Sequence, residues 1–94
     1  MIYKHVIVDD FFLYRNCVVY IDDSGIVIKM NDKTVFDIQY ADIHFVKLAS
    51  IFKNSIKLSF NDNGKIHSFR FAAKNKKETQ EMFSEILKEF QKSK

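Results

Sequence analysis

The sequence contains no proline, no tryptophan, two glycines and a single cysteine. The scarcity of glycine and proline excludes collagen-like, linker-like and low-complexity chains. No run of apolar residues approaches the roughly 18 that a membrane-spanning helix needs. Because Cys17 cannot form an internal disulfide, the chain suits a reducing compartment. Residues 1–5 also lack the apolar stretch of a secretory signal, so a cytoplasmic protein is expected.

The size and composition that remain predict one small globular domain over residues 1–94. The mass is 11.1 kDa, 47% of the residues are hydrophobic, and ten are phenylalanine, so an aromatic-rich core is expected. Charged residues make up 29% of the chain, and this balance excludes intrinsic disorder.

Charge is distributed unevenly along the chain. Residues 1–42 contain four basic and seven acidic groups, whereas residues 43–94 contain eleven basic and five acidic groups. The two parts therefore carry net charges of −3 and +6. The sequence predicts a folded domain with one acidic side and one basic side, although a well-solvated surface accounts for the same pattern.

Alternating polar and apolar residues predict strands over most of the chain. The clearest hairpin joins residues 56–60 to residues 66–71 through Asn61, Asp62, Asn63 and Gly64, because these turn residues tolerate positive φ. Similar patterns with turn residues between them predict seven short strands in total, drawn from extended segments at residues 3–8, 13–14, 17–21, 26–30, 36–40, 43–48, 56–60 and 66–71.

The pattern changes to helical spacing after residue 74. Asn75 can cap a helix, with Glu78 three positions later completing a box-like cap. One apolar stripe follows, formed by Met82, Phe83, Ile86, Leu87 and Phe90. Burial of this stripe against the sheet explains the helix better than local charge pairs do. The fold class is therefore mainly β with one C-terminal α-helix.

The order of these elements resembles the pleckstrin-homology superfold, in its compact bacterial and GRAM-like forms. A glycine hairpin at Gly25 leads to a strand that ends in Tyr40, followed by a short corner with Asp42 and Ile43. The aromatic pair in residues 69–71 precedes the amphipathic helix in a similar way. The resemblance implies a seven-stranded antiparallel barrel or sandwich capped by the C-terminal helix.

The resemblance also implies that ligands meet three loops at the open end, which correspond here to residues 9–12, 31–33 and 61–65. Phosphoinositide-binding members carry lysine or arginine around the first loop, whereas this chain has Asp9 and Asp10. Carboxylates repel phosphates, so selective phosphoinositide binding is not expected. Lys33 and Lys65 are the cations left to contact a partner there.

Residues with catalytic or metal-binding chemistry show no productive spacing. His5, His44 and His67 lie far apart in the sequence, and a zinc site normally needs four nitrogen or sulfur ligands. Cys17 begins an apolar segment, which is typical of a buried small hydrophobic residue. Gly25 and Gly64 stand alone, so no phosphate-binding glycine loop exists. We expect no enzyme activity, no metal and no cofactor.

The adjacent Phe11 and Phe12 are the most informative candidates for binding, because a strand buries only one of two neighbours on a given face. The leading interpretation is a non-catalytic module for protein–protein interaction or self-association through these residues. The alternative is weak binding to anionic membranes or lipids. Nucleic-acid binding is a third possibility, because lysines cluster near the C-terminus, although glutamates interleave with them and arginine occurs only at positions 15 and 70.

Overall fold

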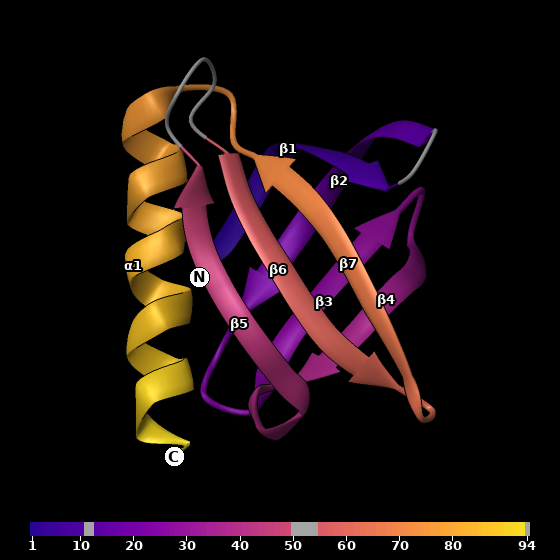
Figure 1. Ribbon diagram of the computed structural model, residues 1–94. Helices are drawn as coiled ribbons and strands as arrows, with labels where there is room; N and C mark the ends of the chain where they lie inside the picture. The colour runs from indigo at the N-terminus through magenta and orange to yellow at the C-terminus, as the bar shows by residue number, and fades with distance from the viewer. Residues whose placement is uncertain (11–12, 50–54, 94) are drawn as a thin grey trace.

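The computed structural model describes residues 1–10, 13–49 and 55–93. Seven strands are followed by one long helix, as the sequence predicts (Figure 1). The elements, in chain order, are β1 (Ile2–Asp10), β2 (Leu13–Ile21), β3 (Gly25–Met30), β4 (Lys33–Gln39), the 3-10 helix η1 (Tyr40–Asp42), β5 (Ile43–Ala49), β6 (Ser55–Asp62), β7 (Lys65–Ala72) and α1 (Lys76–Lys92).

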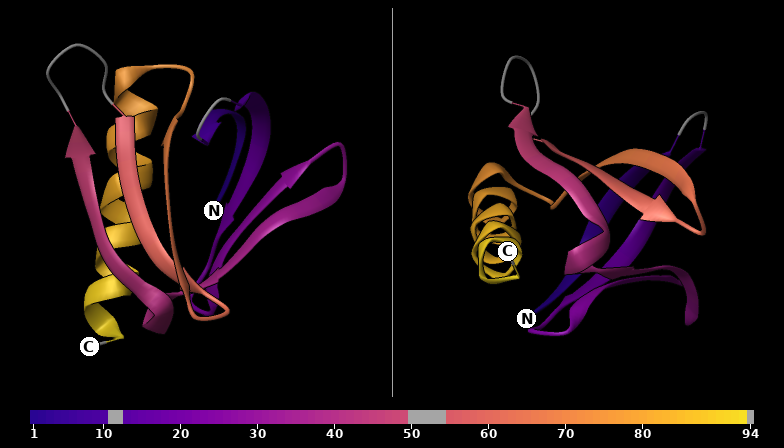
Figure 2. Two further views of the ribbon diagram at one scale, coloured as in Figure 1. Left: turned by 45° about the vertical axis from the view of Figure 1, so that its right-hand side comes forward. Right: turned by 60° about the horizontal axis from the view of Figure 1, so that its bottom comes forward.

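The strands form one antiparallel sheet in the order β4-β3-β2-β1-β7-β6-β5. Three residue pairs, between residues 7–9 of β1 and 70–72 of β7, join its two halves. Figure 2 shows the β3–β4 and β6–β7 hairpins diverging as two layers, with α1 standing beside β5. The helix packs against β5, β6 and η1 and covers the core between the two layers.

Two tight turns follow from residues that accept positive φ. Asn31 and Asp32, with φ of 51° and 64°, connect β3 to β4, and Asn63 and Gly64, with φ of 52° and 86°, connect β6 to β7. Positive φ at both central residues matches the twist of the flanking strands in a two-residue hairpin. Both turns were expected from the sequence, and the β6–β7 hairpin is confirmed.

The strands extend further than the sequence patterns predict. Asp9 and Asp10 belong to β1, where Asp9 pairs with Tyr14 of β2 and with Arg70 of β7. The prediction that they form the first loop is therefore wrong, because pairing on both sides of β1 outweighs the low strand preference of aspartate. The loop predicted over residues 61–65 is also shorter in the structure, since Asn61 and Asp62 complete β6 and Lys65 begins β7.

Aromatic rings connect the two layers of the sheet. Phe36 of β4 stacks on Phe69 of β7, with ring centroids 4.8 Å apart, and meets Phe60 of β6 edge to face at 5.8 Å. His67 is half-buried at 5.1 Å from Phe36, at the rim of this cluster. The phenylalanine-rich core predicted from composition is thus confirmed, and it closes the space between strands that do not pair with each other.

The helix begins and packs as the sequence predicts. The Asn75 side chain accepts a hydrogen bond from the Glu78 backbone N–H at 2.8 Å, which satisfies one of the unpaired donors of the first turn. Met82, Ile86 and Phe90 are buried, whereas Phe83 and Leu87 are half-buried at the edge of the core. The apolar stripe therefore has a fully buried centre and a partly exposed flank.

A polar corner joins the β2–β3 connection to η1. The Tyr40 hydroxyl donates to the Asp22 carbonyl oxygen at 2.6 Å, and the Asp22 carboxylate accepts from the Ser24 hydroxyl and from the backbone N–H groups of Ser24 and Gly25. These bonds to the charged form lower the pKa of Asp22. A Cβ on Gly25 would lie 2.4 Å from the Ile38 carbonyl oxygen, so the close approach of β3 and β4 requires glycine here.

Candidate interaction surfaces

The outer face of β1, β2 and β3 carries a row of apolar side chains in register. Ile2 pairs with Tyr20, and Tyr20 pairs with Val27. Ile2 is 58% exposed, while Tyr20 and Val27 are half-buried. The alternate residues of the same strands point to the opposite face and fill the core; they include Val19, Ile21 and Ile28. These strands are therefore apolar on both faces, and α1 packs mainly against β5, β6 and η1.

A half-buried valine enlarges this row. Val18 of β2 is also partly exposed and pairs with Lys29 of β3. We refer to Ile2, Val18, Tyr20 and Val27 together as the apolar face. It includes two charges at its β3–β4 side: the Lys29 ammonium lies 5.4 Å from the centre of the Tyr20 ring, and Asp37 pairs with Val27. Partly exposed apolar side chains that gather on one face are typical of protein interaction sites.

The edges of the sheet are less suited to pairing with another chain. The edge strands are β4 and β5. The register of β4 against β3 shifts between Ile28 and Lys29, and that of β5 against β6 shifts between Ile43 and Phe45. Such irregularities bend an edge away from further strand addition. The apolar face, rather than an edge, is the better candidate for contact with a partner.

The predicted cations lie at two separate turns. Lys33 begins β4 after the β3–β4 turn, Lys65 begins β7 after the β6–β7 turn, and both are exposed. Figure 1 shows these turns well apart along one side of the molecule. Beside Lys65, Ile66 is 71% exposed. Phe11 and Phe12 lie outside the described residues.

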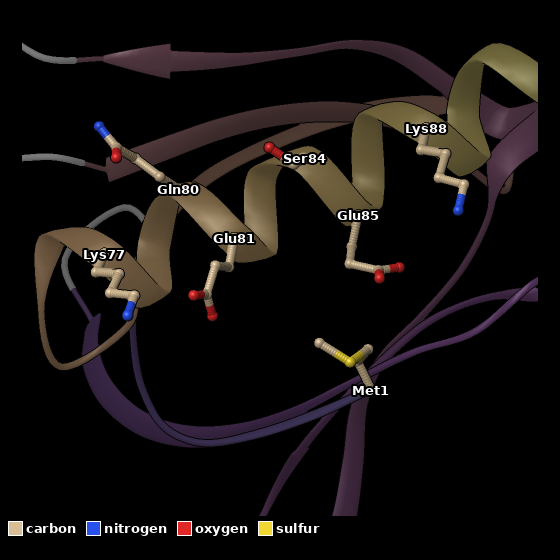
Figure 3. A pocket seen from close by; sticks show the side chains of 7 residues that line it. All are labelled: Met1, Lys77, Gln80, Glu81, Ser84, Glu85 and Lys88. Carbon is tan, nitrogen blue, oxygen red and sulfur yellow. The ribbon is translucent and has the colours of Figure 1, made fainter.

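A shallow groove of about 420 Å³ runs between α1 and the start of β1. In Figure 3, Glu81 and Glu85 point from the helix toward Met1, and Lys77 and Lys88 flank them along the helix. Tyr3 of β1 is buried nearby. Burial, and then the carboxylates of Glu85, Glu81 and Glu78, raise the pKa of its hydroxyl.

The residues with metal-binding or nucleophilic chemistry lie on different strands. His5 and His44 are exposed on β1 and β5, His67 lies among aromatic rings on β7, and Cys17 is buried in β2. Among the residues that the structure describes, no three His, Cys, Asp or Glu side chains gather where they could hold a metal ion. The described part of the chain also contains no helix with the length and apolarity to cross a membrane.

Comparison with known proteins identifies the architecture. No protein-family model matches the sequence, and no curated protein matches it. A solved structure, "PH domain from PfAPH", aligns with 96% of this chain and 82% of its own, with a TM-score of 0.67 and 17% sequence identity. The chain has a pleckstrin-homology-like fold. The architecture inferred from the sequence is thus confirmed, and at this identity the likeness concerns the fold alone.

In this chain the candidate surface lies on the outer side of the strands rather than at the open-end loops. The sequence indicated that these strands have two apolar faces, because residues 18–21 and 26–28 are apolar at both odd and even positions. It did not indicate which of the two faces would point outward.

Proposed function

We propose that this pleckstrin-homology-like domain is a non-catalytic interaction module that binds protein surfaces through the apolar face. The observation that carries the proposal is the in-register row of Ile2, Tyr20 and Val27 on the outside of the sheet. Apolar area that stays in contact with water in the monomer contributes about 25 cal/mol per Å² when a partner covers it.

The partner that we propose is a second copy of the chain. The apolar face contains both a lysine, Lys29, and an aspartate, Asp37, so it is close to neutral. A two-fold axis placed midway between these two charges would bring each of them toward the opposite charge of the other copy. Phe11, Phe12 and Lys33, which follow or precede these same strands in the sequence, are proposed as additional contacts, and Lys65 as a more distant one.

The lipid-binding alternative has less support. Asp9 is exposed at the end of β1, where lipid-binding members of the superfold carry cations, and Lys33 and Lys65 lie at separate turns. The nucleic-acid alternative is also weaker, because glutamates interleave with the C-terminal lysines along α1. Nucleic-acid binding does not account for an apolar row on the outside of β1–β3. A membrane-binding face combines apolar side chains with excess positive charge, whereas Lys29 and Asp37 in this row offset each other.

Light scattering over a concentration series tests the proposal. The unmodified chain should show a mass above the monomer that decreases on dilution, and Val27→Glu should be monomeric, because a carboxylate would be desolvated in the contact. Asn61→Glu, an exposed change on β6, is the matched control and should associate normally. Far-UV circular dichroism should show that both variants are folded.

A photo-crosslinking residue at position 27 or 61 separates a second copy from another protein. Adducts of the chain with itself at position 27, and not at 61, support the proposal. Adducts with a different protein at position 27 would keep the interaction face and replace its partner. A strictly monomeric chain that forms no adduct at position 27 in cells would refute the apolar face as an interaction site.

A further inference from the structure

Three cations lie side by side on the outer face of β5, β6 and β7. Lys47 pairs with Lys57, Lys57 pairs with Arg70, and Arg70 pairs with Asp9 of β1. Side chains directly opposite on neighbouring strands have Cβ atoms about 5 Å apart and share one face. We refer to Lys47, Lys57 and Arg70 as the basic row. Across the sheet, it therefore presents three positive charges followed by one negative charge.

Among the described residues, no carboxylate forms a salt bridge with Lys47, Lys57 or Arg70. The salt bridges among the described residues are Lys74–Glu78 and Lys92–Glu89, both within or beside α1. The Lys47 ammonium instead lies 4.8 Å from the centre of the Phe45 ring. Like charges directly opposite each other destabilise a sheet, so the stability of the fold does not explain why the row is basic.

The middle of the row borders a hollow of about 230 Å³, lined by Asp9, Lys57, Ser68, Phe69 and Arg70. Lys57, Ser68 and Arg70 bring an ammonium, a hydroxyl and a guanidinium to one place. All three groups donate hydrogen bonds, and the guanidinium fits the two oxygens of a carboxylate. These donors suit one oxyanion on the Lys57 side of Arg70, away from Asp9, while Lys47 extends the positive charge to a second.

We infer that the basic row is a docking site for an acidic segment of a protein partner, with carboxylates on the β5–β7 side and no negative charge near Asp9. The basic row lies on β5–β7 and the apolar face on β1–β3, and the inference does not rest on self-association. Charge complementarity of this kind increases binding specificity and the rate of association with the partner.

A protein segment fits the row better than a membrane or a nucleic acid does. Small side chains, including Ser55, Ser68 and Ala72, flank the cations on the same face, and its apolar residues Ile7 and Phe45 are half-buried. Membrane-binding faces combine cations with apolar side chains that insert among lipids, and the exposed Ile66 lies four residues from Arg70, about 13 Å along the strand. Base stacking needs an open aromatic ring, whereas Phe45 is half-buried and Lys47 lies over its ring.

Fluorescence anisotropy with a labelled octaglutamate peptide, at low ionic strength, tests the inference. A row variant that combines Lys47→Gln, Lys57→Gln and Arg70→Gln should bind the peptide about tenfold more weakly than the unmodified chain. The control variant combines Lys4→Gln, Lys76→Gln and Lys88→Gln, which are exposed positions elsewhere. It loses the same net charge and should bind nearly normally.

Two single substitutions sharpen the test. Asp9→Asn should strengthen peptide binding, because it removes the negative charge that pairs with Arg70 at the end of the row. Val27→Glu on the apolar face should leave peptide binding unchanged, so failure of the self-association proposal and failure of this one are distinguishable. Thermal unfolding of each variant should show a cooperative transition.

Three outcomes would overturn the inference. Equal weakening in the row and control variants would mean that the peptide responds only to net charge. Binding to phosphatidylserine vesicles or to single-stranded DNA that is tighter than peptide binding, and that the row variant loses, would assign the row to a lipid or a nucleic acid. Association of the chain with itself that only the row variant abolishes would make a second copy the occupant.

Discussion

Removal of the hydroxyl group from each of two buried tyrosines should change the stability of the domain in opposite directions. Tyr3 and Tyr40 are 6% and 5% exposed. The Tyr40 hydroxyl donates to the Asp22 carbonyl oxygen at 2.6 Å, whereas the Tyr3 hydroxyl has no hydrogen-bond partner among the described residues. We predict that Tyr40→Phe destabilises the domain and that Tyr3→Phe stabilises it.

The magnitudes follow from the surroundings of each hydroxyl. Loss of a paired hydrogen bond costs about 1 kcal/mol, and the Asp22 carbonyl left behind sits at an exposed residue that water can reach. A buried hydroxyl without a partner costs about 1–3 kcal/mol, and phenylalanine removes that penalty without leaving a large cavity. In a domain of this size, 1 kcal/mol shifts the thermal midpoint by about 4–8 °C.

Urea unfolding of the two variants and the unmodified chain gives the comparison. Equal m-values would show that the change lies in the free energy of unfolding rather than in the compactness of either state. A stabilised Tyr40→Phe or a destabilised Tyr3→Phe would refute the reasoning. Destabilisation by Tyr3→Phe would mean that the hydroxyl finds a partner in solution.

The pH dependence provides an independent check on the burial of the two hydroxyls. Burial is the main reason that both pKa values are raised, with Glu85 acting next on Tyr3 and Glu89 on Tyr40. A raised folded-state pKa contributes stability that is present below about pH 10, where unfolded tyrosine titrates, and is lost as the pH rises further. Each phenylalanine variant should therefore lose less stability above pH 10 than the unmodified chain does.

The remaining predictions concern other elements of the fold. Ile86→Ala should cost about 2–5 kcal/mol, because its side chain is fully buried, and urea unfolding should show a smaller loss for the half-buried Phe83→Ala; equal losses would contradict the packing of α1. Gly25→Ala should destabilise by about 1–3 kcal/mol through its approach to the Ile38 carbonyl, whereas Gly64→Ala meets no atom within 4 Å and should cost only about 1–2 kcal/mol for its positive φ. Lys57→Gln should stabilise by about 0.2–1 kcal/mol at low salt, and a gain that persists in about 1 M salt would refute a charge origin. Liposome sedimentation should detect weak phosphoinositide binding, without headgroup selectivity and lost at moderate salt; selective binding at about 0.15 M salt would revive the lipid alternative.

The sequence was sufficient for the order of elements and for much of the register. The two-residue turn at Asn63 and Gly64 determines that Lys57 faces Arg70, because the hairpin is symmetric about the turn. The pairing of Lys47 with Lys57 has no such signal, since residues 50–54 contain no turn motif that sets the register. The pairing of Lys57 with Arg70 was thus predictable from the sequence, whereas the pairing of Lys47 with Lys57 required the structure.

The extent of the first hairpin could not be predicted from local preference. The sequence predicts that Asp9 and Asp10 lie in a turn, because aspartate is depleted in strands. Their backbone groups nevertheless pair with β2, and those of Asp9 with β7 as well. Long-range pairing of this kind depends on segments about 60 residues apart in the sequence, which no local window contains. The apolar face could not be predicted locally either. Alternation along a strand shows which residues share a face, but not which face the second layer of the sheet covers.

The uneven charge of the chain follows the two halves of the sheet, and this bears on whether its two faces act independently. The acidic residues Asp22, Asp23, Asp37 and Asp42 belong to the β1–β4 half or to η1, and the basic row belongs to β5–β7. Those carboxylates and the basic row lie on different layers of the sheet, and packed layers are about 10 Å apart. Exposed charges that are separated by more than the Debye length of about 8 Å at physiological salt are largely screened from each other. An acidic segment on the basic row and a partner on the apolar face should therefore bind almost independently under these conditions. At low salt the screening weakens, so the acidic half should turn an approaching acidic segment toward β5–β7 and accelerate its binding.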